Sequence, residues 1–395
     1  MTDGRVQPKV SVIIACYNGA AYLADAIQSV LDQTYEEFEI IVVDDGSTDN
    51  TPAVAGGFDD PRVRYIRQEN KGRSNARNTG INASRGRYVA FLDADDLFLP
   101  HKLEVQVRYL DECPAVGLAA GGHAYVDAAG TPLHEVHPWR AHTDLGLQAW
   151  LLGCLAAIHA TLVRREWLER VGGFDETLHR AEDWDLWLRL AHAGCPRAWV
   201  EQVVCCYRMH SGQSVRDGYA LRQGVFAVLD KFFARPDVPD DIRARRDYIY
   251  AVAHMRAAGR EYSTNQAEHA KRDLECALAL APDLLGEAGE PLLTELLAWA
   301  DAPGTVDPGA CMKRLFANLP ESAAALHGFR RKALSRRAMR SFFQAHEVGD
   351  RRTVRNSTFH GIVNDPAWLL NRGVWSIGVE AFLGPRVAGW LRRLV

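Results

Sequence analysis

Blocks of apolar residues alternate with amphipathic blocks along the first hundred residues of the chain. Residues 9–19, "KVSVIIACYNG", form a β-branched apolar run that ends in Asn-Gly, which predicts a buried strand leading into a loop. Residues 20–33 carry apolar side chains at helical spacing. The same order, a strand followed by a polar turn and a helix, recurs over 38–51, 63–84 and from 87 onward.

Strands that alternate with helices in this way predict a parallel sheet with helices on both faces, an α/β or Rossmann-like fold. In such sheets ligands bind beyond the carboxyl ends of the strands. The polar stretches 17–19, 44–49 and 93–96 all follow strands. We therefore expect three loops to converge on one crevice. Because no GxGxxG follows the first strand, a dinucleotide cofactor is not expected there.

The remainder of the chain predicts a different organisation. Residues 119–207 mix short strands with an acidic helix, and the pattern after residue 220 is largely helical. Residues 259–282 resemble one degenerate tetratricopeptide-type helical hairpin. We therefore expect a catalytic-type domain over 1–218, a helical domain over 219–301, a Pro/Gly-rich linker over 302–310 and a basic amphipathic helical region over 311–395.

The C-terminal region is basic, although the whole chain is slightly acidic. The formal charge is -4 overall, but residues 329–395 hold 13 Lys and Arg against 4 Asp and Glu. Trp, Phe and Leu mixed with Arg suit a helix in a membrane interface, and they equally suit a terminal helix that docks on the body through its apolar face. Both interpretations stay open at this point.

Composition narrows the class of protein. An acidic body argues against a dedicated nucleic-acid binder. The eight cysteines follow no metal-ligand spacing, which indicates reduced thiols and a cytoplasmic protein. Peripheral contact with the inner face of a membrane, through the C-terminal region, is an open expectation. The N-terminus shows no apolar signal-peptide core, and no run of about 18 apolar residues predicts a spanning helix.

Three carboxylates crowd the end of the fourth strand, in "FLDADD" (91–96). On an extended segment Asp93 and Asp95 point to the same side, and hard oxygen ligands suit Mg²⁺ or Mn²⁺ that also binds phosphates. A solvated turn is the alternative, but the position at the end of a buried strand favours a metal site. Asp96 is expected to cap the following helix instead.

A second acidic cluster is "EDWDLW" (182–187), at the start of a predicted helix. A carboxylate partly desolvated beside the apolar face would have a raised pKa and can act as a general base. Acids favoured by the helix macrodipole explain Glu182 and Asp183 equally well. His210 is a candidate imidazole ligand and Arg77 a candidate phosphate or base contact, each with an ordinary surface role as the alternative.

Seven segments taken together resemble the family 2 glycosyltransferases of the GT-A fold. They are, in chain order, "VSVIIACYNG", "IIVVDDGSTDNT", "GRSNARNTG", "FLDADD", "GGFDE", "EDWDLWLRL" and "YRMHSGQS". Each is weak alone, but seven in register are specific. They span residues 9 to about 214 and leave 220–395 uncovered.

The resemblance implies an inverting transfer of one sugar from a nucleoside-diphosphate sugar, most often a UDP-sugar. Residues implied to bind the donor are Ala15, Tyr17, Asp44, Asp45, Arg77, Asp93, Ala94 and Asp95. Asp95, His210 and Asp93 would hold Mg²⁺ or Mn²⁺, and Asp183 matches the catalytic base. Glu182, Trp184 and Trp187 would form the acceptor side, with core packing as the alternative for the two tryptophans.

The acceptor is left as a glycan, a lipid-linked molecule or a protein, and a homo-oligomer is an open expectation. A nucleotidyltransferase is the enzymatic rival, but it would need a basic, Gly-rich first loop, and "ACYNGAAYL" has no basic residue. The alternative from another functional class is a scaffold without catalytic activity. Such a protein would bind a nucleotide sugar and would bind a partner through its helical half. No QxxRW segment of the processive members is found, which favours single addition.

Overall fold

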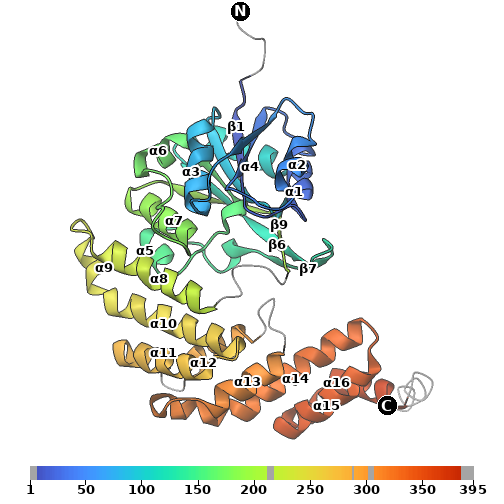
Figure 1. Cartoon of the computed structure of the whole chain (residues 1–395). Helices are drawn as coiled ribbons and strands as arrows, with labels where there is room; N and C mark the ends of the chain where they lie inside the picture. Colours follow the sequence, from blue (N-terminus) through green and yellow to red (C-terminus); the bar gives the residue numbers. More distant parts are fainter. Residues whose placement is uncertain (1–6, 211–217, 287–288, 301–306, 384–395) are drawn as a thin grey trace, which may run out of the picture. The chain divides into compact units, whose positions relative to one another are not determined.

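The structure is a computed structural model that describes residues 7–210, 218–286, 289–300 and 307–383. It divides into two compact units, Met1–Ala253 and His254–Val395, each of which is described by itself (Figure 1). All strands among the described residues lie in the first unit. They are β1 Val10–Cys16, β2 Phe38–Asp44, β3 Val63–Arg67, β4 Tyr88–Asp93, β5 Leu97–Phe98, β6 Leu118–Val126, β7 Pro132–Val136, β8 Thr161–Arg164 and β9 Arg197–Arg208.

Helices make up most of the remaining described chain. Those that begin in the first unit are α1 Leu23–Leu31, α2 Thr51–Gly56, α3 Arg73–Ala83, α4 Lys102–Glu112, α5 Leu147–Leu151, α6 Arg165–Val171, α7 Glu182–His192, α8 Gly218–Phe233, α9 Asp240–Ala244 and α10 Arg246–Ser263. The second unit continues with α11 Ala267–Leu280, α12 Glu290–Ala298, α13 Pro308–Ala317, α14 Arg330–Glu347, α15 Arg351–Asn364 and α16 Arg372–Leu383. Short 3-10 helices are η1 Pro138–Arg140, η2 Ile158–Ala160, η4 Pro282–Leu285, η5 Glu321–Phe329 and η6 Pro366–Leu370.

One sheet runs through the first unit in the order β3-β2-β1-β4-β8-β6-β9-β5, with β7 paired to β6. The first four strands of this order are parallel, as the alternating pattern predicts. Beyond β4 the sheet is mixed, because β8 runs antiparallel to β4 and β6, whereas β6 and β9 are parallel. The expected fold class, an α/β sheet flanked by helices and followed by a helical C-terminal region, is confirmed, although the sheet is mixed rather than mostly parallel.

Helices cover both faces of this sheet. Val12 and Ile14 of β1 pack into a core with α1 and α4, whereas Ile13 between them joins a second core with α7 and α8. Alternate side chains of a strand point to opposite faces, so a strand covered on both sides reads as a continuous apolar run. That is why 10–16 shows no alternation and is apolar except for the buried Ser11.

The first unit extends past the expected domain end at residue 218. Phe232 and Phe233 of α8, Ile242 of α9 and Ile249 of α10 are buried in the same core as α7. Lys231 also pairs with Asp175 and Asp185 across this contact. The helical pattern after residue 220 is real, but periodicity does not tell which core a helix joins.

The second unit is helical, as expected. Gly259 and Tyr262 of α10 and Ala270 of α11 lie on the predicted hairpin, and both Tyr262 and Ala270 are fully buried. Most of the expected linker 302–310 lies outside the described residues, but Pro308 already begins α13. Helix α14 buries Met339 and Phe342 against α15 and α16, so its apolar face is docked within the unit.

No helix in the described ranges combines the length and the apolar content needed to cross a membrane. Residues 384–395 make up much of the C-terminal segment that we expect to dock on the body or to contact a membrane. They lie outside the described residues.

Candidate active site

The ends of β1, β2 and β4 bring three predicted site residues side by side. In the parallel register Ala15 of β1 lies opposite Asp93 of β4, and Cys16 lies opposite Asp44 of β2. Parallel strands end at the same edge of a sheet, so the loops that follow them share one rim. The convergence of loops expected from the sequence is present for these three strands.

Backbone and side-chain hydrogen bonds join the first two of these loops. The amide of Asn18 donates to the Ser47 hydroxyl at 2.9 Å, and the amide of Thr48 donates to the Asn18 side-chain oxygen at 2.8 Å. Asn18 has φ 53°, a left-handed conformation that asparagine tolerates better than most residues. Tyr17 lies beside this contact between the two loops and is 53% exposed, so its ring can contact a ligand.

Asp44 and Asp45 are both buried and serve different partners. Asp44 accepts a hydrogen bond from the Tyr65 hydroxyl at 2.5 Å. Asp45 accepts hydrogen bonds from the amides of Lys71 and Gly72, at 2.9 and 2.8 Å, just before α3. The two carboxylates therefore fix the loops around the crevice, and their predicted contact with the donor stays a prediction.

A buried arginine connects the strand that carries Asp93 with the helix that carries Asp183. Arg77 of α3 is 4% exposed, and its guanidinium donates to Glu182 Oε1 and to Asp93 Oδ1, each at 2.7 Å. Burial alone would raise the pKa of the Asp93 carboxyl, but the charge and hydrogen bond of Arg77 outweigh it and lower that pKa. Arg77 thus occupies the centre of the site rather than an exposed helix face.

Asp183 lies in the first turn of α7, next to this network. Burial, with a contribution from the charge of Glu182, raises the pKa of Asp183 to about 6. Its Oδ1 accepts a hydrogen bond from the amide of Trp184 at 2.8 Å. Ala181, just before the helix, has φ 57°, an uncommon conformation for a residue with a Cβ. Partial desolvation and a raised pKa are the properties that a general base at neutral pH needs.

Asp93 and Asp95 do not lie on one extended segment, and they contact different protein side chains. Strand β4 ends at Asp93, and the chain turns at Ala94 and Asp95. Asp93 binds Arg77, whereas Asp95 Oδ2 lies 2.9 Å from Nε2 of His210, after the end of β9. The extended geometry assumed for the two carboxylates is therefore absent, because the chain turns after Asp93, and their role as ligands of one metal ion stays a prediction. Asp95 and His210, two of the predicted metal ligands, lie within hydrogen-bond distance of each other.

Asp96 does not cap a helix, contrary to the expectation. It is buried, accepts a hydrogen bond from the Arg208 amide at 2.8 Å, and lies 3.0 Å from Nδ1 of the buried His159. Burial raises the pKa of Asp96 to about 6. Ligand atoms of Asp93, Asp96 and His159 lie within 4.8 Å of one another and could hold a metal ion. No sequence signal marks His159, since "AAIHATL" is an apolar run with one histidine.

The predicted acceptor side is mostly interior. Trp187 is fully buried and Trp184 is 4% exposed, and both belong to the core around α7 and α8. Glu182 is 4% exposed and bound to Arg77. In this structure none of the three offers a surface to a sugar ring, so the core-packing alternative holds for both tryptophans.

Comparisons with known proteins bear on the first unit. The family model "Glycosyl transferase family 2" matches residues 11–172. TuaG of Bacillus subtilis, which is named as a teichuronic acid biosynthesis glycosyltransferase, is 32% identical to this chain over 208 residues. These residues cover 51% of this chain and 80% of that protein. An uncharacterised glycosyltransferase of Rickettsia prowazekii is 36% identical over 218 residues, which cover 54% of this chain and 68% of that protein.

A longer relative and two solved structures complete the comparison. An uncharacterised glycosyltransferase of Rickettsia felis is 37% identical over 212 residues, or 52% of this chain, but the chain spans only 35% of that relative's length. Residues 1–349 of TarS from S. aureus, solved with UDP-GlcNAc, match 95% of this chain and 92% of theirs with a TM-score of 0.51 and 17% identity. The mannosyltransferase PcManGT from Pyrobaculum calidifontis, solved with GDP-Man and Mn²⁺, matches 79% of this chain and 87% of its own with a TM-score of 0.50 and 21% identity. At these identities the two structures show a shared fold.

Proposed function

Because the chain belongs to glycosyltransferase family 2, we propose that its first unit transfers one sugar from a nucleoside-diphosphate sugar to a hydroxyl group of an acceptor. The acceptor is a glycan, a lipid-linked molecule or a protein, and the transfer inverts the anomeric carbon. A UDP-sugar is the donor we expect. The relation of TuaG to teichuronic acid supports a glycan acceptor and a place in polysaccharide biosynthesis.

The observation that carries the proposal is the buried ion network around Arg77. Its guanidinium bridges Asp93, at the end of β4, and Glu182, beside Asp183. One side chain thereby fixes the candidate base against the rim on which a donor would lie. Holding the reacting groups in place is a large part of what catalysis requires. Groups that are already oriented lose less entropy on reaching the transition state, which lowers the activation free energy.

Asp183 is the base in this proposal. It removes the proton from the acceptor hydroxyl while that oxygen attacks the anomeric carbon, and the nucleoside diphosphate departs from the opposite face. With a pKa of about 6 the carboxyl is ionised at pH 7 yet remains a better proton acceptor than an exposed aspartate. Ala15, Tyr17 and Asp45 would line the nucleotide side of the crevice.

A divalent metal ion, Mg²⁺ or Mn²⁺, belongs to the same proposal. The oxygen and imidazole donors of Asp95 and His210 suit such an ion, and these side chains are 33% and 17% exposed, so a diphosphate and water can reach them. Asp93, already bound to Arg77, would face the ribose and the metal site. When bound, the ion would neutralise charge on the departing diphosphate.

Removal of divalent metal should weaken donor binding by about a hundredfold, because the diphosphate loses its main counter-charge. Titration of UDP and UDP-sugars by calorimetry, with Mn²⁺ and with EDTA, measures this. Asp95→Asn in the presence of Mn²⁺ should give the same loss. Asp59→Asn, an exposed aspartate outside the site, is the control and should bind as the wild type does. Equal affinity with and without metal would refute the metal site.

Membrane contact and oligomerisation are proposals for the second unit. Phe359 of α15, Leu370 of η6 and Trp375 and Phe382 of α16 are each more than half exposed. If the chain binds an anionic membrane surface, these apolar side chains supply the contact and the neighbouring arginines the charge. The same side chains would supply the contact in a homo-oligomer.

A further inference from the structure

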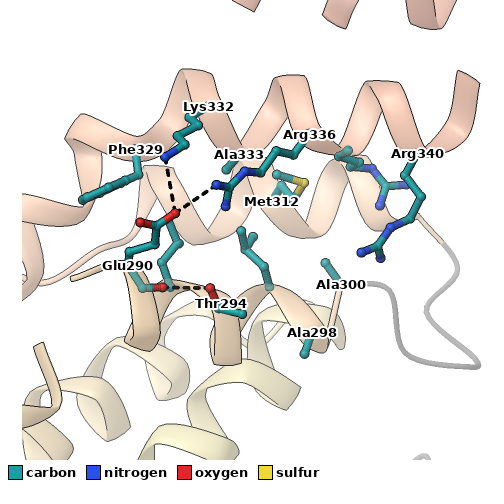
Figure 2. Close-up of a pocket in the computed structure, with 13 residues that line it drawn as sticks. Glu290, Thr294, Ala298, Ala300, Met312, Phe329, Lys332, Ala333, Arg336 and Arg340 are labelled. Carbon is teal, nitrogen blue, oxygen red and sulfur yellow. Dashed lines mark hydrogen bonds and ion pairs between the residues drawn. The ribbon is translucent and has the colours of Figure 1, made fainter. Parts of the chain in front are cut away.

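A basic groove lies between α12, α13 and α14 in the second unit, far along the chain from the candidate active site. Its volume is about 380 Å³. Figure 2 shows α14 above the groove with its basic side chains directed toward it, and α12 below. The lining side chains include Glu290, Leu293, Leu297, Met312, Lys332, Arg336, Arg337 and Arg340. We name this site the basic groove.

The cations of the basic groove come from one face of one helix. Lys332, Arg336 and Arg340 are spaced four residues apart on α14, so they form a stripe with a step of about 6 Å. All three are exposed, while the adjoining face of α14 buries Met339 and Phe342. The packing of α14 therefore fixes the position of the stripe, which places regularly spaced positive charges along the basic groove.

Glu290 shows how an anion fits between two of these cations. Its Oε1 lies 3.0 Å from the Arg336 guanidinium and 3.4 Å from Nζ of Lys332, as the dashed lines in Figure 2 show. Hydrogen bonding from Lys332, followed by its charge, lowers the pKa of Glu290, so the carboxylate stays ionised. Both cations converge on a single carboxylate oxygen, and a ligand's carboxylate or phosphate oxygen would take the same position.

The floor of the basic groove is apolar. Leu293 and Met312 are nearly buried and line it together with Leu297 and Ala333. A ligand that fits must therefore combine anionic groups with C–H faces. Saccharides that carry carboxylate or phosphate groups have both properties: charge for Arg336 and Lys332, and ring faces for the apolar floor.

We propose that the basic groove binds an anionic saccharide chain, with carboxylate or phosphate groups, and holds the growing acceptor on the enzyme. The identification of this ligand as acceptor rests on the proposed function. A lipid surface fits this site less well, because the groove is concave and the most exposed large apolar side chains, Leu370 and Val348, do not line it. Glu290 acts as the occupant that the ligand's anionic group displaces.

Binding of soluble polyanions by the full chain, without any nucleotide sugar, tests the proposal. The probes are oligogalacturonate, inorganic polyphosphate, neutral dextran and vesicles of phosphatidylglycerol and phosphatidylcholine, with affinity measured by calorimetry or co-sedimentation. We expect oligogalacturonate or polyphosphate to bind, more weakly at high salt, and dextran not to bind. Arg336→Glu should weaken this binding about tenfold, because one contact becomes a repulsion.

Removal of the competing acid should act in the opposite direction. Glu290→Gln should strengthen polyanion binding by a few-fold, because Lys332 and Arg336 no longer hold an internal carboxylate. The matched controls are Arg355→Glu on α15 and Glu321→Gln in η5, which make the same charge changes at exposed positions outside the groove. Both should stay within about twofold of the wild type. Thermal unfolding checks that each variant is folded.

Three results would overturn the inference: no binding of either soluble polyanion, equal losses in Arg336→Glu and Arg355→Glu, or binding to anionic vesicles alone. Consumption of nucleotide sugars is measured separately with the wild type. A chain that consumes a donor but binds no polyanion refutes the basic groove and leaves the proposed function intact. A chain that binds polyanions through the groove but neither binds nor consumes any nucleotide sugar refutes the proposed function instead.

Discussion

Replacing Asp183 by asparagine should lower kcat for sugar transfer about a thousandfold and leave donor affinity within about twofold. The amide has nearly the shape of the carboxylate and can still accept the hydrogen bond from the Trp184 amide, but it cannot take a proton at neutral pH. A positioned general base contributes between about a hundredfold and ten-thousandfold. Release of nucleoside diphosphate, with donor binding measured by calorimetry, separates the two effects.

The pH profile is the control for this assignment. With a pKa of about 6 in Asp183, kcat/KM of the wild type should be flat above pH 7 and fall as pH drops through 6, since the base becomes protonated. Asp96 also has a pKa raised to about 6, so only a limb that disappears in Asp183→Asn belongs to Asp183. An Asp183→Asn variant with the wild-type kcat would remove Asp183 from the mechanism.

Replacing Arg77 by methionine should destabilise the first unit by about 3 kcal/mol. Loss of the guanidinium leaves Glu182, 4% exposed, with only the more distant Arg73 as a counter-charge, 3.8 Å away and 41% exposed. Removing the close, hydrogen-bonded partner of a buried charge is strongly destabilising. Asp93 is one-third exposed and contributes less. Denaturant unfolding, followed by tryptophan fluorescence, measures the loss. Transfer should fall as well, since Asp93 and the start of α7 lose their common tether.

Arg85→Met is the matched control for Arg77→Met. Arg85 also binds a buried glutamate, Glu39, but it is 55% exposed, and Arg64 binds the same carboxylate. Its removal leaves Glu39 with a counter-charge and should cost less than about 1 kcal/mol. Equal losses of unfolding free energy in the two variants would show that the ion pairs of Arg77 contribute no more than those of an exposed arginine. The network around Arg77 would then not support the proposed function.

Local sequence patterns predicted the sheet that supports the site well, because both faces of β1, β2 and β4 are covered and their residues are mostly apolar. The exceptions are the hydrogen-bonded pair of Ser11 and Glu39 and the aspartates that end β2 and β4. The family resemblance assigns Asp95 and His210 to one metal site, and the structure places them 2.9 Å apart although 115 residues separate them. A resemblance carries information about the folded arrangement that local periodicity does not, and their binding of a metal stays a prediction.

The remaining differences between the predictions and the structure arise from tertiary contacts that no local sequence pattern encodes. His159 lies in an apolar run, and only folding brings it to Asp96. Trp184 and Trp187 read equally well as sugar-stacking or core residues, and the choice depends on helix α8, which covers them. The same contact moves the end of the first unit from residue 218 to Ala253. Each of these outcomes depends on which surface a helix meets, and periodicity gives only the face that is buried.

The most direct test of the central claim is the stereochemistry of the transferred sugar. The full chain is incubated with Mn²⁺, a panel of α-linked UDP- and GDP-sugars and methanol as a surrogate acceptor, and the anomeric proton of the product is followed by NMR. A single displacement assisted by Asp183 predicts a methyl β-glycoside. A methyl α-glycoside, or a panel left entirely unconsumed, would contradict the account.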